Sequence, residues 1–586
     1  MDFQKGFIYV ALAIIAFLLY SNWQQEHVIG TQAVVESQAV PVTPNTNVPS
    51  ISTISKVKQN PATSVPTVKK PSQAANKPVT QANGEMVTVT TDVLTVKIDT
   101  MGGKILQANL NKYPQKYFQE TPISLFGIKL FTWKVAKYNH EATELLNNKP
   151  GTLYIAESGL TGESGPDTPD HLATYKIDKL DYVLDEDQDS VDVVLHWRNE
   201  DGVKIYKTFT FERGDYSVKV NYTIDNQSLK PWEGNLYALI NRTEVPQEVP
   251  GLFHLATYMG AAISTPNKHY QKVSFKDMTK DPLSMNAGMG WISMIQHYFI
   301  SAWAPKDEGT YHYYSVDNGD DQYTIGLVGP SLSVEGGATK VSELVFYAGP
   351  TTTQQLSQVA PHLDLTVDYG WLWWLSEPIF WVMKHIHDLI GNWGFAIIFV
   401  TVIIKLIFYP LSSLSYRSMA AMRTLQPKMQ AIKERYADDK QKISQATMEL
   451  YRKEKVNPLS GCLPILVQIP FFIALYYVLM ESVELRQAPF IFWIHDLSTR
   501  DPYFILPILM GGSMFLQQRL SPTPPDPTQA KVMMFLPIIF TGMFLFFPSG
   551  LVLYWLTNNV LSISQQWYIT RTYEAGKGKA KNKKKK

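Results

Sequence analysis

One lysine, Lys405, lies inside the apolar segment from Gly391 to Leu411, which is long enough to cross a bilayer. A lysine at the centre of a span costs roughly 3 kcal/mol on translocon-based scales, so such residues usually face a wet cavity or a partner. With Ser412 and Ser413 as the exit, Lys405 is about eight residues inside, or roughly 12 Å at the helical rise. Snorkelling shortens that depth only in part. The sequence favours a functional cation, with snorkelling as the open alternative.

Other polar side chains accompany Lys405 in apolar segments. Thr401 precedes it by four residues, so on a helix the two share one face. Polar groups in lipid need partners or water, and several that converge from different helices would form a hydrated groove. Taken singly, each is more often a hydrogen-bonding contact between helices. The remaining positions of this kind are Gln468, Gln517, Thr557, Asn558 and Asn559.

Enzyme chemistry has little support around these residues. No nucleotide-binding loop, zinc pattern or nucleophile motif accompanies them. His385 and His387 are two apart, so on a helix they do not share a face. We therefore expect no cofactor and no metal, and we predict a passive device rather than a pump, a membrane protease or another enzyme.

The charge of the chain is distributed unevenly. Its 586 residues carry a formal net charge of +1, but a basic tail, residues 567–586, ends in the run from Lys583 to Lys586. Such tails are usually disordered and only solvated; the functional alternative is attraction to anionic membrane lipid or ribosomal RNA, whereas no DNA partner is expected. Cys462 is the single cysteine, so no intramolecular disulfide can form.

The amino-terminal part of the chain predicts an anchor and a linker. The apolar stretch from Phe7 to Tyr20 follows Lys5 and fits either a secretory signal or a membrane anchor. No A-x-A cleavage site follows it, so we favour a retained anchor, residues 1–23, with a cytoplasmic amino terminus. Residues 24–84 are rich in Pro, Thr, Ser and Gln without periodicity, which predicts a flexible linker.

Residues 85–350 change to short alternating runs. The turn sequence Asp201-Gly202 precedes the run from Val203 to Phe211 and favours antiparallel hairpins. We predict an all-β sandwich in the periplasm, in which we find no convincing catalytic constellation; a sugar-processing role stays open, because carboxylate pairs form in space. The clearest alternating face consists of Tyr216, Val218, Val220, Tyr222 and Ile224.

The rest of the chain predicts a helical membrane protein with six spans, five of them after the sandwich. Residues 351–390 form a connector whose tryptophans and charges suit an amphipathic helix in the membrane interface. Lysine and arginine between Ser413 and Lys455, and at Arg519 and Lys531, mark cytoplasmic segments, so both termini are cytoplasmic. The predicted spans are residues 391–411, 458–480, 502–518, 532–547 and 551–566, with a periplasmic loop at 481–501, a cytoplasmic loop at 519–531, and a turn at Pro548-Ser549-Gly550.

The cytoplasmic segment, residues 412–457, predicts a helical hairpin. Asp438 and Asp439 offer a helix start, and Pro427 marks a new helix start or a kink. The apolar residues at three- and four-residue intervals are best explained by packing, with a pliable surface for varied hydrophobic partners as the alternative. They are Met419, Met422, Met429 and Ile432.

Ordered motifs over the last 220 or so residues resemble the YidC membrane protein insertase family. The anchor and β domain are similar to the Gram-negative branch of that family. The motifs are Asp368-Tyr-Gly-Trp-Leu-Trp, Gly391-Asn-Trp-Gly-Phe, Tyr409-Pro-Leu, Leu425-Gln-Pro-Lys, Asn457-Pro-Leu, Gly461-Cys-Leu-Pro, Gln468-Ile-Pro, Glu484-Leu-Arg-Gln-Ala-Pro-Phe, Trp493-Ile-His-Asp-Leu, Asp501-Pro-Tyr, Leu506-Pro-Ile-Leu-Met-Gly and Phe547-Pro-Ser-Gly-Leu-Val-Leu-Tyr.

The resemblance implies an insertase whose groove opens to the cytoplasm and the lipid and holds a positive residue. Lys405 matches that position, where the family commonly has arginine. Lysine keeps the positive charge but cannot form the two parallel hydrogen bonds that a guanidinium makes with a carboxylate. Thr401 and Trp555 match substrate-contacting positions. The implied partners are nascent membrane proteins, the Sec translocon, the ribosome and the signal recognition particle pathway. The alternatives are a secondary transporter with a site at Lys405, or a tethered carbohydrate-active enzyme.

Overall fold

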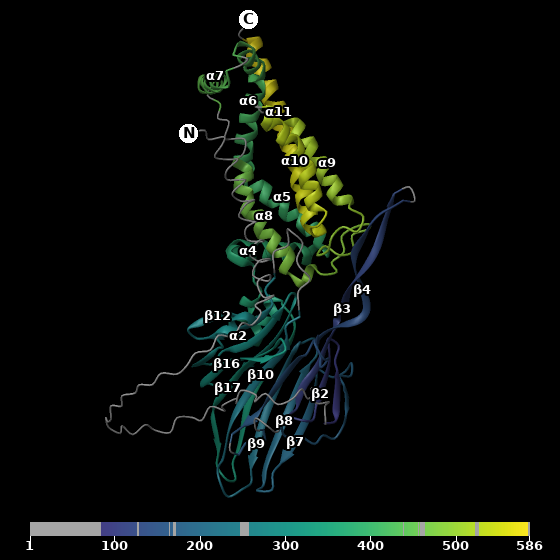
Figure 1. Cartoon of the computed structure of the whole chain (residues 1–586), viewed down its shortest axis with the longest axis vertical. Coiled ribbons are helices and arrows are strands. Elements are labelled where there is room, and N and C mark those ends of the chain that lie inside the picture. Colours follow the sequence, from purple (N-terminus) through teal and green to yellow (C-terminus); the bar gives the residue numbers. More distant parts are fainter. Residues whose placement is uncertain are drawn as a thin grey trace, which may run out of the picture. The chain divides into compact units, whose positions relative to one another are not determined.

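The computed structural model describes residues 84–583, except for 126–127, 163, 168–171, 246–256, 437–438, 455, 457–462 and 522–526. The predicted anchor, all of the predicted linker except its last residue, and Cys462 lie outside the described residues. Within them, strands occupy the chain from Met86 to Pro350 and most of the helices follow (Figure 1).

The first sheet has ten strands. Its order across the sheet is β13 (Ser284–Gly288), β16 (Thr310–Gly319), β17 (Gln322–Val334), β10 (Trp232–Thr243), β5 (Tyr154–Thr161), β3 (Lys104–Leu125), β2 (Leu94–Asp99), β1 (Met86–Thr90) and β6 (Asp181–Val183), with β4 (Ile128–Leu146) paired to β3.

The second sheet has eight strands. Its order is β12 (Lys268–Val273), β11 (Gly260–Thr265), β14 (Trp291–Gln296), β15 (Phe299–Pro305), β18 (Thr339–Pro350), β9 (Ser217–Asn226), β8 (Val203–Glu212) and β7 (Ser190–Arg198). One short helix, α2 (Phe275–Lys280), follows β12.

The predicted β-sandwich is confirmed. Side chains of both sheets form one apolar core, and the indole N–H of Trp303 on β15 donates to the carbonyl of Leu239 on β10 at 3.2 Å. Burial alternates strictly along β8 and β9, so every residue of the predicted alternating face is buried. The turn before β8 contains Gly202 at φ 99°, a conformation that glycine adopts without steric cost.

One feature of the sandwich is absent from the sequence predictions. Beyond Leu110, β3 leaves the sheet and continues with β4 as a two-stranded ribbon to the pair Leu125 and Ile128 (Figure 1). Between Leu110 and Lys116 the register shifts twice, and such irregularities bend a strand and increase its twist.

Helices make up the remainder. In chain order they are α3 (Thr353–Val359), the 3₁₀ turns η1 (Leu363–Thr366) and η2 (Gly370–Leu372), α4 (Trp373–Ile390), α5 (Trp393–Ile407), α6 (Tyr409–Arg435), α7 (Lys440–Lys453), α8 (Leu463–Glu481), η4 (Val483–Leu485), α9 (Ile505–Leu520), α10 (Pro527–Phe544) and α11 (Ser549–Lys583). Six helices share one apolar core, to which each contributes a buried residue: Met383, Ile397, Leu475, Met510, Phe544 and Leu551.

The predicted amphipathic helix is present as α4. Its buried face consists of Ser376, Ile379 and Met383, whereas Trp374 and Trp381 are 58% and 61% exposed. Exposed tryptophans beside an apolar helix face are typical of helices at a membrane interface. The membrane position of α4 stays a prediction.

The helices differ in how well their length and apolar character suit a bilayer. Among the described residues, no single helix has the length and apolar character needed to cross a bilayer, but α5 and α6 meet the requirement as a pair bent by 69°. Two shorter apolar helices span Leu466–Glu481 and Lys531–Phe544.

The predicted single helix over residues 391–411 is broken near its carboxyl end. The helix α5 ends at Ile407, and α6 begins at Tyr409 in a new direction. Pro410 explains the break, because it has no N–H to extend the helical ladder and its ring clashes with the carbonyl four residues earlier. Lys405 therefore lies in the last turn of a helix rather than deep within one.

Further expectations need correction. Of the two interpretations of Pro427, a new helix start is wrong, because Pro427 lies inside α6 on an exposed position, while a kink there stays a prediction. Ser549 and Gly550 belong to α11, so the turn before that helix ends at Pro548. The basic tail is helical as far as Lys583, because α11 simply continues through lysines, which are good helix formers.

Candidate functional site

Lys405 is 4% exposed and belongs to the buried face of α5. Its ammonium nitrogen donates to the hydroxyl of Ser562 on α11 at 2.7 Å. In the described part of the chain, no acidic side chain forms an ion pair with it. The cation is therefore held by one neutral hydroxyl.

Local sequence fixes the orientation of α5. Asn392 caps the helix by accepting a 3.1 Å hydrogen bond from the N–H of Phe395, which satisfies one of the free donors of the first turn. The amide of Asn392 also donates to the carbonyl of Phe490 at 3.1 Å, in the loop between α8 and α9. Both ends of α5 are thus defined, by this cap and by Pro410.

Thr401 lies one turn before Lys405 on the same buried face and is 1% exposed. Its hydroxyl donates to the carbonyl of Ile397 at 2.7 Å, inside its own helix. Serine and threonine often satisfy their hydroxyls in this way in helices. Thr401 is therefore satisfied within α5 and is buried in the packing around Lys405.

A row of buried polar residues follows one face of α11. Asn559, Ser562 and Gln566 are spaced three and four residues apart, so they lie on one side of the helix. They are 4%, 3% and 2% exposed. Asn559 donates to the hydroxyl of Ser513 on α9 at 3.0 Å, while Ser562 accepts from Lys405. This row joins α11 to both α5 and α9.

Ser562, Ser513 and Gln566 were missed in the sequence analysis. The signal that could have found Ser562 and Gln566 is the helical spacing from Asn559, which repeats through the last apolar segment. Ser513 carries no such signal, because its partner is 46 residues away on another helix.

Trp555 begins the same row of α11, four residues before Asn559. Its ring packs edge-on against Phe472 of α8, with centroids 4.7 Å apart, and against Phe544 of α10 at 5.3 Å. The indole nitrogen is buried and has no hydrogen-bond partner among the described residues. Trp555 therefore combines an apolar contact surface with an unused donor.

Gln468 on α8 and Gln517 on α9 are both half-buried. No hydrogen bond joins either side chain to a described residue, so the structure connects neither of them to Lys405. Thr557 and Asn558 are also half-buried, and the carbonyl of Asn558 accepts from the Ser562 hydroxyl at 2.7 Å. Of the predicted polar positions, Lys405 and Asn558 meet at Ser562.

The cytoplasmic helices α6 and α7 pack through a small apolar cluster. Leu425, Met429 and Tyr451 are its buried members, and Met422 lies at its margin. The Tyr451 hydroxyl contacts the Met429 sulfur at 3.4 Å. Asp439 begins α7 as predicted, since its carboxylate accepts from two backbone N–H groups, and these bonds lower its pKa.

The other predicted hairpin contacts, Met419 and Ile432, are half-buried. Packing between α6 and α7 therefore explains the apolar residue Met429, whereas the side chains of Met419, Met422 and Ile432 remain partly exposed. Lys428 and Glu454 form an exposed ion pair at 2.5 Å between the two helices. Exposed pairs of this kind contribute little, so the apolar cluster is the main contact.

Known proteins resemble this chain over most of its length. A family model described as "60Kd inner membrane protein" matches residues 385–577, and one described as "YidC periplasmic domain" matches residues 86–130 and 127–382. A relative from Stutzerimonas stutzeri (strain A1501), "Membrane protein insertase YidC", is 46% identical over 580 residues, covering 98% of this chain and 99% of the relative. A relative of the same description from Pseudomonas fluorescens (strain SBW25) is 46% identical over 585 residues and covers 99% of this chain and 100% of its own length.

Among solved structures, "Active YidC insertase crystal structure with the first transmembrane domain resolved" aligns over 83% of this chain and 95% of that chain. The identity is 19% and the TM-score is 0.36, which is too low for any structural inference.

Proposed function

Because this chain belongs to the YidC family of membrane protein insertases, we propose that Lys405 draws the polar flank of a nascent membrane segment into a hydrated groove. The protein is a membrane insertase of the inner membrane with a periplasmic domain, and it is not an enzyme. The transporter and the carbohydrate-active enzyme, the two alternatives from the sequence, have no support among its relatives.

The single observation that carries the proposal is the buried ammonium of Lys405 with a neutral partner. A buried charge without a counter-charge is costly, and an arriving carboxylate offsets that cost. An ammonium attracts a carboxylate as a point charge and lacks the paired geometry of arginine. Lys405 therefore attracts acidic or polar flanks in general and does not recognise one particular sequence.

The substrate path continues past Trp555. Burying about twenty apolar residues in lipid is strongly favourable, so the protein has only to lower the barrier for the polar flank. The aromatic contacts of Trp555 with Phe472 and Phe544 give a passing apolar helix a rigid surface to pack against. Gln468, Gln517 and Asn559 would line the wet side of the same path.

The membrane topology is part of the proposal. Six spans, with both termini in the cytoplasm and residues 85–350 in the periplasm, agree with the clusters of lysine and arginine in the short loops. In this arrangement the groove opens towards the cytoplasm and the lipid, and the loop from 481 to 501 closes it towards the periplasm.

The cytoplasmic helices α6 and α7 would receive the substrate first. The half-buried Met419, Met422 and Ile432 offer a pliable apolar surface, because methionine adapts to varied partners. The lysines at the end of α11 favour contact with ribosomal RNA by charge. Cooperation with the Sec translocon and the signal recognition particle pathway is expected from the family.

Photo-crosslinking to a stalled nascent membrane protein tests this path. A photo-reactive amino acid at Thr401 or Trp555 should crosslink to the apolar segment of the nascent chain. The matched controls are Phe399 on α5, which is 47% exposed, and Val560 on α11, which is 49% exposed. Equal crosslinking from the controls, or none from Trp555, contradicts the proposed path.

A further inference from the structure

The sandwich, the connector and the end of α8 surround a cavity of about 170 Å³. An apolar cavity of about 150 Å³ can hold a benzene molecule, so this cavity has room for a small organic group. At Gly370 in its wall, an added Cβ would lie 2.7 Å from the ring of Tyr477, so glycine lets that ring close the wall. The polar and aromatic side chains of the wall include Tyr258, Tyr270, Lys272, His297, Asp368, Tyr477 and Glu481.

Three polar groups of this wall are paired within the protein. Lys272 of β12 forms an ion pair with Asp368, and its ammonium lies 4.8 Å from the ring centre of Tyr258. The other carboxylate oxygen of Asp368 accepts from the backbone N–H two residues later at 2.9 Å. The ring of His297 donates to the carbonyl of Met480 at 2.9 Å, a bond that a neutral imidazole can make. These groups hold the sandwich, the connector and α8 together.

Two other groups of the wall have no such partner. No ion pair or hydrogen bond joins the partly buried carboxyl group of Glu481, the last residue of α8, to another described residue. The hydroxyl of Tyr270 is buried and also lacks a hydrogen-bond partner among the described residues. Buried polar groups in proteins are nearly always hydrogen-bonded. Glu481 and Tyr270 therefore indicate a bound molecule that donates hydrogen bonds.

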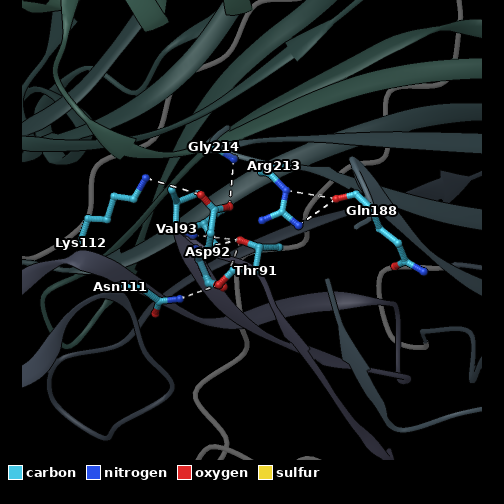
Figure 2. Close-up of polar contacts among 9 residues, drawn as sticks. Thr91, Asp92, Val93, Asn111, Lys112, Gln188, Arg213 and Gly214 are labelled. Atoms are coloured by element: carbon cyan, nitrogen blue, oxygen red, sulfur yellow. Dashed lines mark hydrogen bonds and ion pairs between the residues drawn. The ribbon is translucent and has the colours of Figure 1, made fainter. Parts of the chain in front are cut away.

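The cluster around Asp92 in the sandwich shows the contrast (Figure 2). One oxygen of Asp92 pairs with Lys112 at 3.5 Å, and the other accepts from the N–H of Gly214 at 2.9 Å. Both oxygens have partners inside the protein, so a structural role explains this acid. No such pairing explains Glu481.

The charges and rings of the wall favour a cation. The wall contains the carboxyl groups of Asp368 and Glu481 but only the one ammonium of Lys272, so a cationic ligand would balance the second carboxylate. Aromatic ring faces also attract cations. The Lys272 ammonium lies 5.9 Å from the ring centre of Tyr270, which shows that an ammonium fits against these rings.

A primary ammonium fits better than a metal ion. Its three N–H groups can donate to the Glu481 carboxylate and to the Tyr270 oxygen together. In the part of the chain that the structure describes, no group of three His, Cys, Asp or Glu side chains is placed to hold a metal ion. A quaternary ammonium has no N–H, so it would leave both acceptors unpaired.

The position of Glu481 indicates where such an ammonium comes from. Glu481 directly follows the predicted span 458–480, so in the proposed topology, on which this step rests, the cavity lies level with the lipid headgroups. The side chains of Lys272 and Asp368 are 40% and 32% exposed, so the wall is accessible from outside on their side. An ethanolamine headgroup carries an ammonium and a phosphate, which match the carboxyl group of Glu481 and the ammonium of Lys272.

We propose that the cavity binds the primary ammonium of an ethanolamine lipid headgroup through Glu481 and Tyr270. The bound lipid joins β12 of the sandwich to the end of α8 and thereby fixes the sandwich at the periplasmic surface of the membrane. The site shares no residue with the polar contacts around Lys405.

Native mass spectrometry of the full chain, in a detergent without amine or choline groups, tests the proposal. The fraction of protein that carries one lipid is measured with dihexanoylphosphatidylethanolamine and with dihexanoylphosphatidylcholine. Ethylammonium chloride is then added as a free competitor, and potassium chloride at equal ionic strength is its control. The variants are Glu481→Gln and Tyr270→Phe, and the matched control is Glu377→Gln, which changes an exposed acid of α4 outside the wall.

The unsubstituted protein should bind the ethanolamine lipid about tenfold more tightly than the choline lipid, as expected for a charge-assisted hydrogen bond. Glu481→Gln should remove this preference, Tyr270→Phe should reduce it by about threefold, and Glu377→Gln should keep it. Ethylammonium should displace the lipid only at concentrations above that of the lipid, and potassium should not displace it.

Equal binding of the two lipids, or a preference that survives both Glu481→Gln and Tyr270→Phe, overturns the proposal. Displacement by ethylammonium below the lipid concentration would assign the site to a free amine and overturn the lipid as its source. Equal displacement by potassium would reduce the effect to ionic screening and overturn the site. If Glu481→Gln does not fold, Tyr270→Phe decides, because it keeps the ring. Binding in detergent does not depend on the membrane topology, so failure of this test says nothing against the groove at Lys405.

Discussion

Lys405 and Ser562, 157 residues apart in the chain, are joined by a 2.7 Å hydrogen bond. The Ser562 hydroxyl donates a hydrogen bond to the carbonyl of Asn558 at 2.7 Å, so it accepts from the ammonium while it donates along α11. An ammonium has three donors. No other described residue accepts from Lys405, so two of its three N–H donors have no hydrogen-bond partner among the described residues.

Lys405→Glu should block the insertion of substrates with acidic flanks, while Lys405→Arg should retain it. The exchange replaces attraction by repulsion, and a charge-assisted hydrogen bond of roughly 1.5–3 kcal/mol corresponds to about a tenfold to hundredfold loss. The measurement is protease protection of a model substrate in a depletion strain, with a neutral-flank substrate as the control. Normal insertion of the acidic-flank substrate by Lys405→Glu would refute the charge role.

Ser562→Ala should destabilise the helical domain by about 1–3 kcal/mol, because it leaves the buried ammonium without its partner. The matched variant Ser564→Ala is on the same helix with an exposed hydroxyl, and it should have little effect. Thermal unfolding in detergent checks both. Equal melting temperatures for the two variants would show that the bond at Lys405 is not needed for stability.

The sandwich was predictable from sequence because its signal is local. Alternation along β8 and β9, with a glycine turn before β8, is contained in about twenty-five neighbouring residues. The polar contacts of the helical part are not local. Ser562 and Ser513 bond to residues on other helices, and the sequence alone does not show which helices meet. The end of α5 could have been predicted from Pro410, but the apolar character of residues 391–411 suggested one longer helix. The β3–β4 ribbon was not predicted as a separate feature. Its sequence has no Asn-Gly or Asp-Gly pair to mark a hairpin turn.

Met429→Ser should separate α6 from α7. The side chain is 8% exposed and contacts Tyr451, so a polar replacement loses apolar burial of about 2 kcal/mol in a cluster that has three buried members among the described residues. Hydrogen exchange of α7 amides should become faster, and a defect in substrate capture should accompany it. Met448→Ser is the control, because Met448 is 46% exposed on α7. Unchanged exchange in α7 would mean that other contacts hold the hairpin.

Lys207 makes the stability of the sandwich depend on pH. It is fully buried, and its ammonium donates to the carbonyls of Gly102, Gly103 and Ser158 at 2.7–3.1 Å. Burial lowers its pKa from 10.5 to about 7, and the charges of Asp167 and Glu157 oppose that shift. Between these two pKa values the unfolded chain binds more protons than the folded one, so stability should rise with pH over that window.

The expected slope is at most about 1.4 kcal/mol per pH unit between about pH 7 and pH 9.5. Above about pH 10 the trend should reverse, because buried tyrosines such as Tyr222, whose pKa is raised by burial, stay protonated only in the folded state. Lys207→Met should remove the rise, and it should also lower stability by about 3 kcal/mol, since three carbonyls lose their donor. Lys204→Met, on the opposite face of β8, should keep the rise. A flat stability curve for the unsubstituted protein over this window would mean that Lys207 keeps its ordinary pKa, held by the three carbonyls.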